Sequence, residues 1–287
     1  MAWSEQKIQQ YWKRGRGAGE GAQYVPWLMP EDLPAKQRWT ATPHNWKHNR
    51  TSYLVSELDL AYFYVLQWSD DVIDMRESYP LPRERTMALA QERHLSHPKI
   101  TGTQIPLVMT TSFLVTHKEG LQALSVVETR HVTDKVRQQL EIIQSYWAEQ
   151  RVPWMLITED QVPWTLARNV QTLHRHRLAA SEIDQGIAKL LLDELQNLDD
   201  WDRRTFNIIA FTQHVGAKQG LVPAKIMEHL LFLMANERVV FDIYNVSLDL
   251  GRTRMNQLTA VDGEFTVKTI MTPPRIFPHY VLVNAHE

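Results

Sequence analysis

Two hydrophobic patterns follow one another along the chain, and the change between them falls near residue 158. Before it, apolar residues at Leu54, Leu58, Tyr62, Val65 and Leu66 recur at helical spacing, which predicts an amphipathic helix over 52–67. The other elements expected in this part are a short helix at 5–14, strands at 72–76, 107–116 and 123–130, a turn at 117–120, a helix at 133–150 and a strand at 151–158. This order of elements (a helix, a strand, a hairpin, a helix and a strand) predicts a mixed α/β core, in which helices flank a sheet.

After residue 158 the pattern becomes mainly helical. The expected elements are helices at 160–175, 181–197, 201–216 and 223–236, followed by a strand at 238–244 and a turn region ending in Gly251-Arg252-Thr253-Arg254. Helices followed by a β-hairpin suggest a winged-helix-like fold. We therefore expect two domains, 1–158 and 159–287, the second closing with an extended tail that contains Pro273, Pro274 and Pro278.

Composition narrows the class of protein. Hydrophobic residues make up 44% and charged residues 22% of the 287 residues, which is typical of a soluble globular protein. No apolar run approaches the roughly 20 residues that span a bilayer, and the N-terminus lacks the apolar core of a signal peptide. Cysteine is absent, so disulfides and thiolate metal sites are excluded. We expect a cytoplasmic protein that does not act at membranes.

The formal net charge of −2 is not that of a bulk nucleic-acid binder. A local basic face or a bound divalent cation still allows DNA binding, because affinity follows the local field. The candidates for phosphate contacts are Arg14, Arg16 and Lys47 in the first domain and Arg252 and Arg254 in the expected wing of the second. A solvated loop is the alternative for the last two.

Four glycines alternate with other residues over 15–21, but this segment does not follow an apolar strand and lacks the Gly-Lys-Ser/Thr ending of a phosphate-binding loop. We interpret it as a flexible arm that touches DNA through Lys13, Arg14 and Arg16, or as a plain loop. The pairs His44/His48 and His174/His176 do not form convincing metal sites, since the first lies in a loop-like stretch and the second diverges on a helix.

The hairpin expected from the strands at 107–116 and 123–130 contains most of the candidate catalytic residues. Metal-dependent cleavage of a phosphodiester needs clustered carboxylates that hold Mg²⁺, and an economical arrangement is an Asp on one strand with Glu-x-Lys on the next. Glu128 and Arg130 stand two residues apart at the end of an expected strand and would share a face. A hairpin centred on Gly120 places Ser112 opposite Glu128, and Asp59 on the preceding helix adds a carboxylate.

Structural alternatives accompany these candidates. Ser56 and Asp59 have the spacing of a helix-capping pair, in which the two side chains satisfy backbone donors of the first turn. Glu128 and Arg130 have the spacing of a solvent-facing strand pair.

Several motifs together resemble the TnsA family of transposon end-cleaving endonuclease subunits. Ser56-Glu57-Leu58-Asp59-Leu60-Ala61 is similar to the family's Ser-x-Leu-Glu-Leu-Ala, and Val72-Ile73-Asp74-Met75-Arg76-Glu77 before Pro80-Leu81 is similar to its Val-x-Asp-x-Arg-Glu-x-x-Pro-Leu. Met109-Thr110-Thr111-Ser112-Phe113-Leu114-Val115 resembles the strand that carries the family's catalytic Asp. Further landmarks are Arg14-Gly15-Arg16-Gly17, Tyr24-Val25-Pro26-Trp27-Leu28, Tyr146-Trp147 and Val152-Pro153-Trp154. The resemblance is good over 10–175 and weak beyond.

The resemblance implies a restriction-endonuclease-like first domain and a winged-helix-like second domain. It implies a subunit that cuts the 5′ ends of a transposon with Mg²⁺, for which Mn²⁺ can substitute. It also implies three partners: transposon-end DNA, a DDE-type transposase subunit that cuts and joins the 3′ ends, and an AAA+ ATPase regulator.

The chain departs from the family at three of the four site positions. Asp59 replaces a Glu, Ser112 replaces the catalytic Asp, and Arg130 replaces a Lys, whereas Glu128 is compatible. Serine is a neutral and weak ligand for Mg²⁺, and Arg does not replace Lys geometrically.

We therefore expect a weakened or non-catalytic subunit that keeps its DNA and its partners. One alternative is an active endonuclease with metal on Asp59 and Glu128, or with Glu57, Asp74, Glu77 or Glu119 moved into the role. Another is a restriction-type nuclease or DNA-binding regulator unrelated to transposition.

Overall fold

The computed structural model describes residues 3–33, 40–177 and 182–261. The chain forms two compact units, Met1–Gln171 and Thr172–Glu287. The tail expected around Pro273 lies outside the described residues. No helix in the described ranges combines the length and the apolar character that crossing a membrane would require.

The first unit is built on a four-stranded sheet in the order β3-β4-β5-β6. The strands are β3 (Val72–Pro80), β4 (Thr110–His117), β5 (Gly120–Val126) and β6 (Trp154–Ile157). β3, β4 and β5 pair antiparallel, and β6 pairs parallel to β5. Two short strands, β1 (His44–Asn45) and β2 (Arg50–Thr51), pair separately. The sheet is therefore mixed, as the order of patterns predicts.

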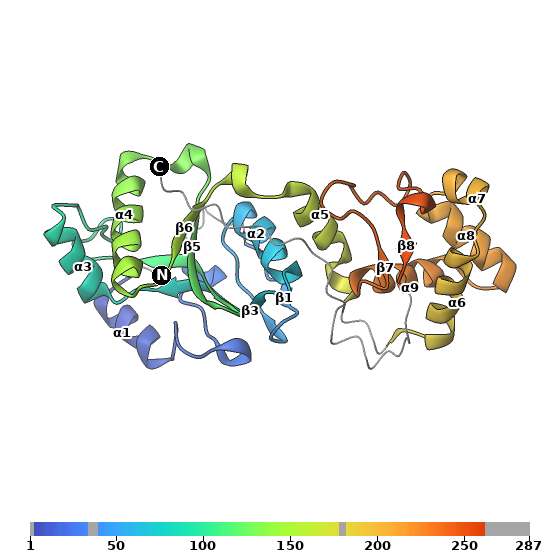
Figure 1. Cartoon of the computed structure of the whole chain (residues 1–287). Helices are drawn as coiled ribbons and strands as arrows, with labels where there is room; N and C mark the ends of the chain where they lie inside the picture. The colour runs from blue at the N-terminus through green and yellow to red at the C-terminus, as the bar shows by residue number, and fades with distance from the viewer. Residues whose placement is uncertain (1–2, 34–39, 178–181, 262–287) are drawn as a thin grey trace. The chain divides into compact units, whose positions relative to one another are not determined.

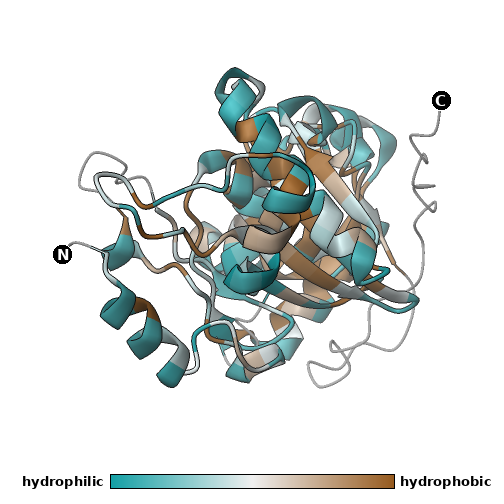
Figure 2. Cartoon of the chain, turned by 90° about the vertical axis from the view of Figure 1, so that its left-hand side faces the viewer, coloured by the Kyte–Doolittle hydropathy of each residue, from teal (hydrophilic) through white to brown (hydrophobic). Residues whose placement is uncertain are grey.

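Helices cover this sheet. They are α1 (Glu5–Lys13), α2 (Glu57–Trp68), α3 (Arg83–Glu92), α4 (Asp134–Glu149) and α5 (Trp164–Leu173). Figure 1 shows α4 along one side of the sheet and α2 on the other. Leu114 and Ala123 of the hairpin pack with Leu89 of α3 and with Ile142 and Trp147 of α4 in a buried cluster. The hydrophobic residues gather in the sheet, and the outer surfaces of the helices are hydrophilic (Figure 2).

Three differences from the sequence-based expectation in this unit affect the positions of the candidate residues and of the helices around them. β3, expected over 72–76, runs on to Pro80, and the segment after it, for which we expected no element before residue 107, contains α3. The helix expected from residue 52 begins at Glu57, because Ser56 has an extended backbone and caps it. The strand expected to reach Arg130 ends at Val126, and Thr129–His131 form a short 3-10 helix.

The second unit is mainly helical. It contains α6 (Gln185–Gln196), α7 (Asp200–Thr205), α8 (Ile208–Gln219) and α9 (Pro223–Ala235), with β7 (Val239–Val240) paired antiparallel to β8 (Thr259–Ala260). Both α6 and α8 contact α9, whose residues from His229 to Ala235 are all buried. The strand expected over 238–244 is reduced to Val239–Val240, because Asp242 accepts hydrogen bonds from the backbone of Tyr244 and Asn245 and turns the chain.

Short 3-10 turns follow two strands of the sheet: Thr129–His131 lies after β5, and Glu159–Gln161 lies after β6. The compact first unit extends to Gln171, so most of α5 belongs to it, although the sequence pattern placed the boundary at residue 158.

Candidate functional site

Asp59 lies in the first turn of α2, and its side chain is engaged in capping that helix. The Ser56 hydroxyl accepts from the backbone N–H of Asp59 at 3.0 Å and donates to its Oδ2 at 2.8 Å. This confirms the capping interpretation of the pair. Within the described residues, no hydrogen bond or ion pair joins Asp59 to Ser112 or to Glu128.

The environment of Asp59 disfavours a charged carboxylate. The residue is 6% exposed, and burial raises its pKa to about 6, with the Ser56 hydroxyl acting in the opposite direction. Asp59 thus contributes one desolvated carboxyl group, and its Oδ1 is buried and makes no hydrogen bond among the described residues.

Ser112 faces a different residue from the one we expected. The hairpin pairs Phe113 with Leu124 and His117 with Gly120, so Lys118 and Glu119 form its turn. At the open end of the hairpin, the Ser112 hydroxyl accepts from the backbone N–H of Val126 at 2.9 Å. The expectation that Ser112 stands opposite Glu128 is therefore wrong, because the turn is centred before Gly120 and not on it.

Glu128 and Arg130 lie beyond the end of β5. Glu128 precedes the short 3-10 helix that contains Arg130, and Arg130 Nε lies 2.5 Å from Glu128 Oε2. The Arg130 side chain is 74% exposed and that of Glu128 is 25% exposed. The two residues form a surface ion pair after the strand, so the expected strand face that would carry both does not exist.

The other carboxylates we considered do not complete a site. Arg50 donates to both oxygens of Glu77, at 2.7 and 2.6 Å, and the N–H of Tyr53 adds a third hydrogen bond. Glu57 is exposed, and Glu119 lies in the hairpin turn, at the opposite end of the strands from Ser112.

The Asp74 carboxylate also has charged partners already. His48 Nε2 lies 2.9 Å from its Oδ1, and Arg76 Nε lies 3.4 Å from its Oδ2. Burial acts to raise the pKa of Asp74, but the hydrogen bond and charge of His48, the N–H of Gly21 and the charge of Arg76 hold it below its usual value. This carboxylate is ionised and already paired.

A magnesium site of the kind that the fold implies needs several oxygen ligands carrying negative charge. In the described part of the chain, no three His, Asp or Glu side chains are grouped so as to hold a metal ion. The candidate positions offer one buried carboxyl group with a raised pKa, one neutral hydroxyl and one carboxylate paired with an arginine. These residues do not fit a bound Mg²⁺ or Mn²⁺.

The predicted DNA-contacting residues divide into buried and exposed ones. Arg16 is 7% exposed, donates to the Trp27 carbonyl at 2.8 Å, forms an ion pair with Asp32 and stacks on the Tyr11 ring at 3.8 Å. Its guanidinium is satisfied inside the protein, so it is not available to a DNA interface. Arg14 is exposed.

The remaining three candidates lie at the surface or near it. Lys47 is half-buried and donates to the Ser69 carbonyl at 2.7 Å. Arg252, with its side chain 89% exposed, and the exposed Arg254 lie in the segment between β7 and β8, where Arg254 donates to the Thr205 carbonyl.

The glycine-rich segment is packed against β3. Gly17 has φ +80°, its N–H donates to the Val25 carbonyl, and a Cβ there would overlap the ring of Pro80. The N–H of Gly21 points at Asp74 Oδ2, 3.4 Å away. Of the two interpretations of this segment, the structured loop agrees with these contacts, and the flexible arm does not.

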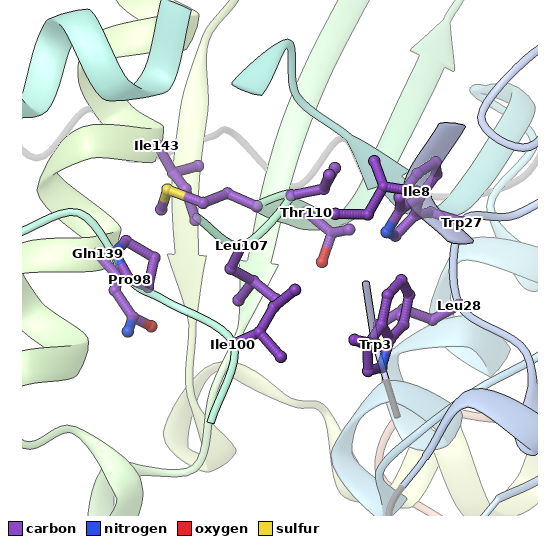
Figure 3. A pocket seen from close by; sticks show the side chains of 12 residues that line it. Trp3, Ile8, Trp27, Leu28, Pro98, Ile100, Leu107, Thr110, Gln139 and Ile143 are labelled. Atoms are coloured by element: carbon purple, nitrogen blue, oxygen red, sulfur yellow. The ribbon is translucent and has the colours of Figure 1, made fainter. Parts of the chain in front are cut away.

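A pocket of about 160 Å³ lies near the start of β4 (Figure 3). Trp3 and Trp27 line one side and Gln139 and Ile143 another, and Thr110 is the lining residue nearest in sequence to Ser112. Its lining holds no ionisable side chain, so it cannot supply the carboxylates or the cation that the candidate site lacks.

Sequence reasoning missed Val126, which contacts Ser112. The available signal was the turn, because Lys118-Glu119 forms a two-residue connection and leaves Gly120 inside the strand.

The comparisons with known proteins agree with this fold. Residues 69–159, from the end of α2 to the turn after β6, match the family described as TnsA-like endonuclease N terminal. The chain is 28% identical over 249 residues to the transposon Tn7 transposition protein TnsA of Escherichia coli, an alignment that covers 85% of this chain and 88% of that protein. Together with the mixed sheet, the hairpin and the mainly helical second unit, these matches support the resemblance of this chain to the TnsA family.

Proposed function

We propose that the protein is a TnsA-like subunit of a DNA transposition complex whose own nuclease site is inactive. It binds transposon-end DNA beside a DDE-type transposase subunit and an AAA+ ATPase regulator, and contributes structure to that assembly without cutting the 5′ strand. The observation that carries the proposal is Ser112, a neutral residue at the position of the family's catalytic Asp, with its hydroxyl bonded to the N–H of Val126.

The chemistry supports inactivity for two reasons. A metal ion that polarises a phosphate and activates water needs more than one negatively charged ligand, and Asp59 alone offers a carboxyl group with a pKa of about 6. The cation expected nearby is also missing, because the Arg130 guanidinium is directed to Glu128 at the surface. Metal-dependent cleavage therefore lacks both a ligand set and an orienting cation.

DNA binding is the function that the remaining residues support. Arg14 in the first unit and Arg252 and Arg254 in the second are exposed cations suited to phosphate contacts. Each phosphate contact removed should lower the slope of log affinity against log salt by about 1. We expect Arg252→Ala to weaken binding to end DNA and unrelated DNA alike, and fluorescence anisotropy over a salt series measures this.

The direct test is cleavage of duplexes with the ends of the element, labelled on the 5′ strand, by wild-type protein with the partner transposase and Mg²⁺ or Mn²⁺. We expect 3′-strand cutting by the transposase and no 5′-strand cutting. Cutting of the 5′ strand that depends on this subunit would establish the rival function, an active endonuclease.

A second consequence concerns the product of transposition. When only the 3′ strands are cut and joined, the donor and the target stay connected, and replication yields a cointegrate. We expect cointegrates from the complete system, and a donor backbone excised by the wild-type proteins would contradict the proposal.

A further inference from the structure

The two edges of the four-stranded sheet have different surroundings. β3 forms one edge, where the N–H of Trp27 donates to the Ser78 carbonyl at 3.3 Å. The Tyr24 hydroxyl donates to the Glu77 carbonyl of the same strand at 2.9 Å. β6 forms the other edge, beside β5 (Figure 1). A free edge can pair with a further strand, because its N–H and C=O groups lack partners.

β6 presents a free edge at Trp154 and Leu156. The strand runs parallel to β5, and the N–H of Ala123 on β5 donates to the Pro153 carbonyl at 2.9 Å. Because the main-chain groups of successive residues in a strand point to opposite sides, those of Pro153 and Met155 face β5. Those of Trp154 and Leu156 point away from the sheet. Among the described residues, these outward N–H and C=O groups make no hydrogen bond.

The sequence of β6 does not guard this edge. Natural sheets protect their edges with charged side chains or with a proline that removes an outward N–H. β6 (Trp154–Ile157) consists of apolar residues, and Pro153 before it belongs to the set that faces β5. The side chains of Trp154, Met155 and Leu156 are half-buried, so the strand lies at the protein surface. An incoming strand therefore meets free main-chain groups and apolar side chains together.

The two ends of this edge carry opposite charges. Arg151 precedes the strand and Asp160 follows it, and both residues are exposed. Neither forms an ion pair with another described residue. A copy of the same chain in antiparallel orientation brings the positive end against the negative end twice, whereas a parallel copy opposes like charges. The edge is thus complementary to itself, and this charge pattern selects a second copy as its partner.

We propose that two copies of this chain associate by pairing their β6 strands antiparallel, about a two-fold axis that passes beside Met155. Trp154 of each copy exchanges both main-chain hydrogen bonds with Leu156 of the other, since these residues hold the outward groups. Arg151 and Asp160 then lie on facing flanks. The pairing joins the two sheets into one, and it requires neither DNA nor a metal ion, so it goes beyond the proposed function.

The symmetry makes Met155 its own neighbour, which a single cysteine can test in a chain that has none. The two Met155 positions form a non-hydrogen-bonded pair with Cα atoms about 4.5 Å apart, within the range that a disulfide bridges. We expect Met155→Cys to give a covalent dimer under mild oxidation, seen by non-reducing electrophoresis. The matched control is Leu121→Cys, at a side chain of β5 that is 40% exposed, for which we expect roughly tenfold less dimer.

Sedimentation velocity of the full chain over a concentration series measures the association without a cross-link. A short strand pair covers a small area, so we expect a weak dimer of the 33.5 kDa chain in exchange with the monomer. Leu156→Pro removes an outward N–H and no hydrogen bond of the sheet, and it should weaken the dimer about tenfold. Leu156→Ala is its control, because it keeps that N–H and should weaken the dimer less.

A charge exchange decides whether the partner is a second copy. At low salt, Arg151→Asp places like charges on both flanks and should weaken the dimer about threefold. Asp tolerates the left-handed backbone at this position, where φ is +56°. The double variant Arg151→Asp/Asp160→Arg restores opposite charges and should return the dimer to within about twofold of wild type. A structural effect of the first substitution would not be reversed by the second.

Circular dichroism checks that each variant folds; where Leu156→Pro does not, the charge exchange and the cysteine decide. A wild-type chain that stays monomeric up to about 0.5 mM would overturn the inference. So would a dimer that a folded Leu156→Pro leaves unchanged, or a double charge variant no better than Arg151→Asp. A cross-link no stronger with Met155→Cys than with Leu121→Cys would do the same.

These measurements contain no DNA, metal ion or transposase. Failure of the pairing therefore leaves the proposed function untouched, and cutting of DNA by the wild-type chain would refute inactivity without affecting the pairing.

Discussion

Two regions of the first unit resemble the same family, yet they have very different electrostatics. On β3, Asp74, Arg76 and Glu77 are buried and paired, and they connect the strand to the glycine-rich segment and to the segment around β1 and β2. At the open end of the β4–β5 hairpin, Ser112 is neutral and bonded to a backbone N–H, and Glu128 and Arg130 form an ion pair at the surface.

The difference between the buried ion pairs of β3 and the residues at the hairpin end separates the structural features of this chain from its candidate site. The β3 residues hold the N-terminal 80 residues together, because a buried ion pair that loses one partner leaves an uncompensated charge in the interior. At the hairpin, Ser112 makes a hydrogen bond to the Val126 N–H and Glu128 makes a surface ion pair, so neither leaves a buried charge uncompensated. The mixed sheet with its helices is present, and in the described part of the chain no three His, Asp or Glu side chains are grouped so as to hold a metal ion.

The largest effect is expected from Glu77→Ala. Glu77 is 1% exposed and accepts two hydrogen bonds from Arg50, so its removal leaves a buried guanidinium unpaired. We expect a loss of about 3–5 kcal/mol in the free energy of unfolding. Urea unfolding followed by tryptophan fluorescence measures it, because nine of the ten Trp residues lie in the first unit. A loss below 1 kcal/mol would show that this network is not structural.

Asp59→Asn should reveal the cost of a buried carboxylate. The folded pKa of about 6 lies above the ordinary value of 3.8, so the stability that protonation of Asp59 contributes is complete below about pH 4 and lost as the pH rises through 6. Relative to the Asp59→Asn variant, whose amide does not titrate, wild type should lose up to about 3 kcal/mol between pH 4 and pH 7.5. Urea unfolding of both proteins at these pH values checks this, and a difference independent of pH would contradict it.

Gly17→Ala tests whether the glycine-rich segment is part of the folded structure. Gly17 has φ +80° and lies against Pro80, so we expect a loss of about 2 kcal/mol or more. Gly15 is the matched control, since it has φ +74° but no atom within 4 Å of the place that a Cβ would take, and Gly15→Ala should cost only about 1 kcal/mol. Equal effects at both positions would argue against close packing on Pro80.

Arg130→Ala should have the smallest effect. It removes an ion pair of the same kind as Arg50–Glu77, but with its cation 74% exposed, where such a pair contributes about 0–1 kcal/mol. Thermal unfolding at low and high salt measures it. A loss above 2 kcal/mol would place Arg130 in the structural network and would end the contrast between the two regions.

Much of the fold follows from local patterns in the sequence. The helical spacing from Leu58 to Leu66 predicts α2, the apolar runs predict the hairpin, and the order of elements predicts a mixed sheet with a mainly helical second part. Helix α3 was not predictable in this way, because Met87, Ala88, Leu89 and Ala90 form one apolar run in a polar segment and no periodic stripe.

The candidate site was predictable in composition and not in geometry. Its residue types, above all Ser112 where an Asp is expected, are read directly from the sequence, since a charge is absent whatever the fold. Which residue meets Ser112 depends on the position of the turn, and a shift of the strand pairing exchanges every neighbour. Whether Arg16 is available to DNA was likewise decided by packing, because only the folded chain brings Asp32 and the Tyr11 ring to its guanidinium.

The sequence by itself thus determined most of the elements, the family resemblance and the neutral residue at position 112, all of which depend on residue identity and local periodicity. The tertiary structure decided that Val126 contacts Ser112, that Asp74 and Glu77 are paired, and that Arg130 lies outside the strand. These facts depend on contacts between residues far apart in the chain, and local propensity does not encode such contacts.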